Sequence, residues 1–221
     1  MSVISRVWFR LRFAAARLAG NSSGIAATEF AVIVPLMLVL FFGTVEFSSG
    51  VAIDRKVTLI ARALSDLTGQ AAPTTLAATY STVDDTYLQN VFTAGMKIVD
   101  PYPATPIQAT ITEVYVDSNQ VAKVQWSKAA TVSASASQAT LAASTRHAGD
   151  VVTPIVPSAL LVQQTYLIFS EVSYLYTPTI GYVMATTGVT LADVAYTRPR
   201  EVTCVIYNSL PAATSCAQTP P

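Results

Sequence analysis

The pattern of hydrophobic and polar positions begins with a long apolar run. Residues 30–45 carry no charged side chain, and the residues from Gly24 to Thr28 in front of them are also uncharged. Together these positions reach the roughly 20 apolar residues that a helix needs to cross a bilayer core. We therefore expect a membrane-spanning helix over residues 25–48, with a single carboxylate, Glu29, near its start.

A second periodic segment follows this run without a break. Apolar residues recur there close to the i, i+3, i+4 spacing of an amphipathic helix. These positions are Val51, Ile53, Val57, Ile60, Ala61, Leu64 and Leu67. We expect one helix over residues 25–68, in which residues 49–68 bury one stripe against a domain and Gly69 ends the helix. The small residues of 69–79 are expected to form a linker.

A shorter helix is expected over residues 81–97. Ser81 and Thr82 stand three positions before Asp84 and Asp85, which is the Ser/Thr-x-x-Asp/Glu pattern of a helix start. Apolar residues then recur on one face, at Val83, Tyr87, Val91, Phe92 and Met96. The prolines of the following segment, "DPYPATP", end this helix.

Strand patterns dominate the rest of the chain. Residues 107–126 alternate well enough for a hairpin, with its turn in the polar cluster at 117–119. Residues 160–178 and 194–208 are β-branched and aromatic enough for further strands, the second of them broken by Pro199.

Residues 127–150 are rich in Ala, Ser and Thr and lack strong periodicity, so either a weak helix or an exposed loop is expected there. A long helix followed by antiparallel strands predicts an α+β fold. Residues 80–221 would form its small, pilin-like module, placed outside the cytoplasm.

Charge gives the chain an orientation. The net charge is zero, yet four arginines precede Gly24 and no acid appears before Glu29. By the positive-inside rule, residues 1–24 form a basic cytoplasmic leader and the module lies on the opposite side of the membrane. A cleaved secretory signal also has a basic front and an apolar middle, but its apolar region is usually about 7–15 residues long, which fits this longer run poorly.

Cys204 and Cys216 are the only cysteines. On the oxidising side of a membrane, two cysteines this close are expected to form a disulfide, which would stabilise the fold by roughly 3 kcal/mol in the chain-entropy model. Two independent free thiols are the alternative.

Several motifs together resemble a known family. Gly24, four residues and then Glu29-Phe30 open the apolar run, Pro35 lies inside it, and Gly43-x-x-Glu46-Phe47 closes it. This arrangement is similar to the TadE/TadG-like pseudopilins of tight-adherence pili. The stretches "EVSYLYTP" and "TRPRE" resemble segments near the C-terminus of that family. TadG-type relatives usually carry an Asp-x-Ser-x-Ser metal motif, which this short chain lacks, so the resemblance is TadE-like.

The resemblance implies a processing step and an assembly step. A prepilin peptidase of the inner membrane would cut between Gly24 and Ile25. The carboxylate of Glu29 would then pair with the new α-amino group of a neighbouring subunit, which offsets the cost of two separate charges at the membrane edge. Phe30 belongs to the same motif, and Pro35 would be a point where the helix can bend.

Simpler interpretations remain open at each of these positions. Glu29 could be the boundary residue of an ordinary signal anchor, Gly24 an exposed residue before a helix, and Pro35 a proline without a role. The pair Arg198 and Arg200 could contact another subunit or could form a solvated edge that discourages aggregation.

The residues that carry catalysis are scarce. His147 is the only histidine and is expected at the surface, and two cysteines with one histidine make a poor zinc site. Clustered basic residues of a nucleic-acid site are absent beyond the leader. We expect no enzyme activity, cofactor, metal, nucleic acid or small-molecule substrate.

Three functions are therefore weighed. The first is a pseudopilin or minor pilin that is cut after Gly24 and joins a tight-adherence pilus used in adhesion, with pilin subunits as partners. The second is an uncleaved, signal-anchored periplasmic scaffold or binding protein of a pilus or secretion machine. A membrane-tethered hydrolase is the third and the weakest.

Overall fold

The computed structural model describes most of the chain. It covers residues 23–73, 75, 78–133, 136–178, 187–207 and 216. The predicted basic leader lies outside the described residues except for its last two positions. The order of elements confirms the expected α+β class, because one long helix precedes an antiparallel sheet.

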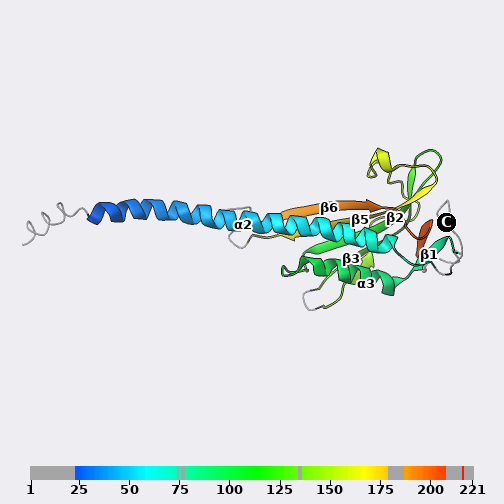
Figure 1. The fold of residues 1–221 in the computed structure, drawn as a ribbon, viewed down its shortest axis with the longest axis horizontal. Coiled ribbons are helices and arrows are strands. Elements are labelled where there is room, and N and C mark those ends of the chain that lie inside the picture. The colour runs from blue at the N-terminus through cyan, green and yellow to red at the C-terminus, as the bar shows by residue number, and fades with distance from the viewer. Residues whose placement is uncertain are drawn as a thin grey trace, which may run out of the picture.

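One continuous helix, α2 (Ser23–Gly69), confirms the helix expected over residues 25–68. Its first half stands away from the rest of the molecule, and its second half lies along the sheet (Figure 1). The residues buried in the second half include Ile53, Val57, Ile60, Ala61 and Leu64, which are five of the seven predicted positions. Val51 and Leu67 were wrongly assigned to the buried stripe, since they are 38% and 37% exposed.

The module is built on a five-stranded antiparallel sheet of order β4-β3-β2-β5-β6. Its strands are β2 (Ile107–Val116), β3 (Ala122–Thr131), β4 (Thr140–Ala143), β5 (Thr165–Tyr176) and β6 (Val189–Thr197). The hairpin β2–β3 confirms the predicted turn, in which the Asp117 side chain accepts hydrogen bonds from the backbone of Asn119 and Val121 at 2.8 and 2.9 Å. β5 confirms the strand predicted within residues 160–178.

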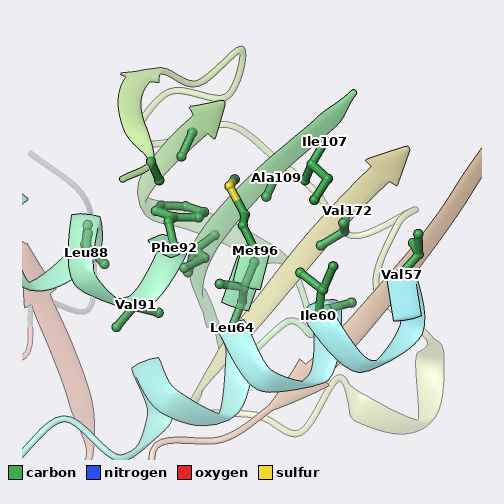
Figure 2. Packing of buried hydrophobic residues seen from close by; sticks show 14 of the residues in the cluster. Val57, Ile60, Leu64, Leu88, Val91, Phe92, Met96, Ile107, Ala109 and Val172 are labelled. Atoms are coloured by element: carbon green, nitrogen blue, oxygen red, sulfur yellow. The ribbon is translucent and has the colours of Figure 1, made fainter. Parts of the chain in front are cut away.

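The core lies between the sheet and the two helices. Leu64 and Ile60 of α2 point toward Phe92 and Met96 of the shorter helix and toward Val172 of β5 (Figure 2). The two helices approach closely at Gly95, where an added Cβ would come within 2.6 Å of a Leu64 methyl carbon. The i, i+3, i+4 stripe of α2 is therefore used as the sequence pattern indicates.

The second helix begins later than predicted. α3 runs from Asp85 to Met96, and its N-cap is Asp84, whose side chain accepts a hydrogen bond from the backbone N–H of Tyr87 at 2.7 Å. The 3₁₀ turn η1 (Lys97–Val99) follows it. Ser81 and Thr82 do not start the helix, because they belong to strand β1 (Tyr80–Val83). Pairing with a distant strand outweighs the local capping pattern here.

The partner of β1 is β7 (Cys204–Tyr207), and the two form a separate parallel pair. The strand expected over residues 194–208 is therefore divided between two sheets, with Pro199 in the connection. The sequence pattern had predicted antiparallel strands only.

The prediction for the Ala-, Ser- and Thr-rich residues 127–150 is also corrected. β3 continues to Thr131, and β4 pairs with it at the sheet edge from Thr140 to Ala143. The expected weak helix or exposed loop is thus wrong for these positions, because backbone pairing holds them in the sheet despite their weak periodicity. A 3₁₀ turn, η2 (Ser158–Leu160), lies in the connection before β5.

Candidate functional site: the apolar helix and its attachment to the module

The first turn of α2 is open to its surroundings. A Cβ added at Gly24 would meet no atom within 4 Å, and Ile25 is 62% exposed. Glu29 lies on the exposed surface one turn further on, and it forms no ion pair within the part of the chain that the structure describes. The backbone between Gly24 and Ile25 is thus sterically accessible.

The apolar half of α2 is exposed on every side. Phe30, Leu36, Leu40 and Phe41 each expose more than 60% of their surface. This half therefore satisfies the length and composition of a membrane-spanning helix, with nothing in the described chain burying it. Pro35 lies inside α2 without interrupting it.

A second carboxylate marks the other end of the uncharged run. Glu46 is only 4% exposed, and its Oε2 accepts a hydrogen bond of 2.5 Å from the Tyr176 hydroxyl at the end of β5. The Tyr176 ring packs against Gly50, one turn further along the helix. The helix and the module therefore meet at a contact between residues that are 130 positions apart.

The pKa of Tyr176 shows which member of the Glu46–Tyr176 pair holds the proton. Burial, together with the neighbouring Glu46 carboxylate, raises the pKa of Tyr176 to about 12. The phenol therefore stays protonated at physiological pH and remains the donor. Sequence reasoning had noted each partner in a separate motif, Glu46 at the end of the run and Tyr176 in "EVSYLYTP", but not their contact.

Further polar contacts fasten the second half of α2 to the module. Lys56 Nζ donates to the backbone carbonyls of Ile98 and Asp100 at 2.8 and 2.7 Å. The Ser170 hydroxyl of β5 donates to the Ala61 carbonyl, and the Tyr87 hydroxyl of α3 donates to the Leu67 carbonyl. Because these contacts come from different elements, the helix is held along its length.

The predicted arginine pair lies at the end of the helix. Arg200 forms an ion pair with Asp66, and its backbone N–H donates to the Gly69 carbonyl at 2.9 Å. Arg198 is exposed, and its carbonyl oxygen would be 3.3 Å from a Cβ added at Gly69. A contact of either arginine with another subunit stays a prediction.

The C-terminal strand is held by a separate buried cluster. Cys204 and Cys216 form the expected disulfide. The buried Glu113 carboxyl accepts hydrogen bonds from the Val205 backbone N–H at 2.6 Å and from Trp126 Nε1 at 2.9 Å. Burial raises the pKa of Glu113 to about 8, and the two hydrogen bonds oppose this only in part. No sequence pattern had singled out Glu113, which lies next to an irregularity in the register of β2 and β3.

The other ionisable groups of the described residues form no second site. His147 is exposed as expected, and its Nδ1 lies 3.8 Å from a carboxylate oxygen of Asp150 on the same loop. Among the described residues, no three His, Cys, Asp or Glu side chains gather in a group that could hold a metal ion.

The candidate site is thus an exposed apolar helix that begins at Gly24 and continues into a stripe packed on the module. Residues 24–63 match the family model of TadE-like protein. The match begins at the predicted processing glycine and ends inside the amphipathic half of α2. A search of curated proteins and a search of solved structures each found no match.

The matched segment lies entirely within the long helix α2, and over these residues the chain is similar to TadE-like proteins. The apolar half of α2 is suited to anchoring the protein in a membrane. The module from β1 onward lies outside the matched residues.

Proposed function

We propose that the protein is a TadE-like pseudopilin or minor pilin that takes part in assembly of a tight-adherence pilus. The observation that carries this proposal is the exposed apolar half of α2, which begins with Gly24 and carries Glu29 one turn later. The match of residues 24–63 to TadE-like proteins supports it.

In this proposal the chain is a single-pass protein of the bacterial inner membrane. The arginine-rich leader stays in the cytoplasm, and the module lies in the periplasm, where its disulfide is stable. A prepilin peptidase cuts between Gly24 and Ile25. The accessible backbone at this position is compatible with such a cut.

Glu29 then acts in assembly. Cleavage would create an α-ammonium group at Ile25, and the Glu29 carboxylate of an adjacent subunit would pair with it. Each charge is costly at the edge of a bilayer, and pairing offsets part of that cost while it fixes the axial register of the two helices. The partners of the protein are therefore pilin and pseudopilin subunits, and the pilus is used in adhesion.

The first test is N-terminal sequencing of the protein from its native membrane, with an intact mass from the same sample. We expect the chain to begin at Ile25. The variant Gly24→Leu should retain the leader, and Gly20→Leu, which alters another leader glycine, should be processed normally. A native chain that begins at Met1 or Ser2 would contradict processing and favour the uncleaved periplasmic scaffold.

The second test separates processing from assembly. Glu29→Gln should still begin at Ile25 but should enter the pilus poorly, because the amide cannot neutralise the ammonium group. Thr28→Ser serves as the matched neighbour, since it keeps the hydroxyl that donates to the Ile25 carbonyl at 2.8 Å. Normal pilus formation by Glu29→Gln would remove the assembly role of this carboxylate.

A further inference from the structure

Two segments at the end of the module that faces the apolar half of α2 carry no charge. The sequence between Glu171 and Asp193 contains no charged residue, and neither does α2 between Glu46 and Asp54. Glu46 itself is 4% exposed and bonded to Tyr176. The end of β5, the start of β6 and the adjacent turns of α2 therefore present no exposed charge.

The height of this surface relative to the span follows from two contacts along β5. Ser170 contacts the Ala61 carbonyl and Tyr176 contacts Glu46, so β5 runs antiparallel to α2 and ends toward the apolar half. The helix rises about 22 Å over those fifteen residues, and the strand advances about 20 Å over its six. The helix and the strand therefore cover similar lengths between these two contacts, and Tyr176 lies at the level of Glu46.

Exposed apolar side chains gather at this level. Leu175 is 46% exposed at the end of β5, and Val189, which pairs with Tyr176, is 38% exposed at the start of β6. Phe47 and Val51 of α2 are 67% and 38% exposed nearby along the helix. In Figure 1 the start of β6 lies beside the middle of α2, whereas η2 lies toward the opposite end of the module.

We infer that this surface, made of Leu175, Val189 and Phe47, rests in the interfacial layer of the membrane. The inference depends on the membrane span of the proposed function. A hydrocarbon core of about 30 Å that ends at Val45 leaves a headgroup layer of about 5–7 Å beyond it. That layer covers Glu46 to about Gly50, which is the level of Tyr176.

We infer lipid as the partner of this surface, because no exposed charged residue separates it from the apolar half of α2. Tyr176 shields the Glu46 carboxylate, the one charge that would otherwise oppose contact with the acyl boundary. On α2 and β6 the next charged residues are Asp54 and Asp193, and both lie farther from the span along their elements. Contact with the membrane should therefore need no anionic lipid.

The experiment uses the full-length chain in nanodiscs that hold one copy each. Its own cysteines form a disulfide, so single cysteines introduced as Leu175→Cys or Val189→Cys can be labelled with an environment-sensitive fluorophore. Val162→Cys is the matched control, since Val162 is 42% exposed and precedes the opposite end of β5. Met37→Cys reports on the span itself; it is read with lipids that carry the spin label deep on the acyl chain, because it lies about 12 Å inside the edge of the core at Val45.

We expect lipids with a spin label near the headgroup to quench positions 175 and 189 at least about twofold more than position 162, in zwitterionic and in mixed anionic discs alike. One copy per disc excludes contact with a second chain as the cause. If position 37 is quenched while 175 and 189 match 162, the inference fails and the span stands. If position 37 is also unquenched, both the span and this inference fail.

Discussion

At the scale of single residues, two carboxyl groups are removed from water. Glu46 accepts a hydrogen bond from the Tyr176 phenol beside the apolar run, whereas Glu113 accepts hydrogen bonds from Val205 and Trp126 at the other end of the module. A buried carboxyl with only neutral donors favours its protonated form, so the pKa of Glu113 is raised. This shift links folding stability to pH.

The stability of the protein should fall as pH rises from about 4.5 to about 8. Folding raises the pKa of Glu113 from 4.5 to about 8, so the folded state binds the proton more tightly than the unfolded state does. The stabilisation is complete below pH 4.5 and is lost through pH 8, with a slope of up to about 1.4 kcal/mol per pH unit.

Urea unfolding of the chain in detergent micelles, followed by Trp126 fluorescence across this range, measures the slope. Glu113→Gln cannot titrate and should flatten it. Glu201→Gln changes an exposed carboxylate and should leave it intact. An unchanged slope in Glu113→Gln would show that other groups carry the pH dependence.

At the scale of elements, the buried stripe of α2 joins the helix to α3 and the sheet. Leu64 is fully buried, and it faces Gly95, where the two helices approach closely. Leu59 belongs to the same helix but is 52% exposed. The stripe therefore holds the layers together, and the outer face of the helix does not contribute to the core.

Leu64→Ala should lower the free energy of unfolding by about 2–5 kcal/mol, because it removes buried contacts and leaves a cavity. Leu59→Ala, the same substitution on the exposed face, should change it by less than about 0.5 kcal/mol. Chemical denaturation of both variants under one condition gives the comparison. Similar losses in the two variants would contradict the packing described for α2.

The sequence predicts elements well where a local period decides them. α2, the β2–β3 hairpin and the strand β5 were recognisable from spacing and turn residues alone. Prediction from the sequence failed where pairing with a distant segment determines the local structure. Ser81 looks like a helix start, yet it pairs with Val205 more than 120 positions later in the chain.

The candidate site was predictable to a similar extent. The Gly24 and Glu29 spacing was visible in the sequence, because it lies within one helical turn and a half. The contacts of Glu46 with Tyr176 and of Glu113 with Val205 were not, since they depend on how β5 and β7 are placed in space.

At the scale of the whole molecule, the contact between Glu46 and Tyr176 lies where the apolar half of α2 meets the module. Tyr176→Phe removes the phenol donor but keeps the ring on Gly50. We expect a loss of about 1.5–3 kcal/mol, typical of a hydrogen bond to a charged group.

A double-mutant cycle with Glu46→Gln, measured by denaturation in nanodiscs, isolates the coupling between the two side chains. Tyr174→Phe is the control, because Tyr174 is buried on the same strand and its hydroxyl forms no hydrogen bond among the described residues. Additive effects of Tyr176→Phe and Glu46→Gln would mean that the two side chains do not stabilise each other.

The repeated fastening of α2 has a mechanical consequence. Contacts at Glu46, Lys56, Ala61 and Asp66 are spread over about 30 Å of one uninterrupted helix. A pull on the apolar half is therefore shared among several attachments in parallel, so no single bond must bear the load. If the helix is drawn out of the bilayer, as the proposed assembly requires, the module should move with it as one rigid unit.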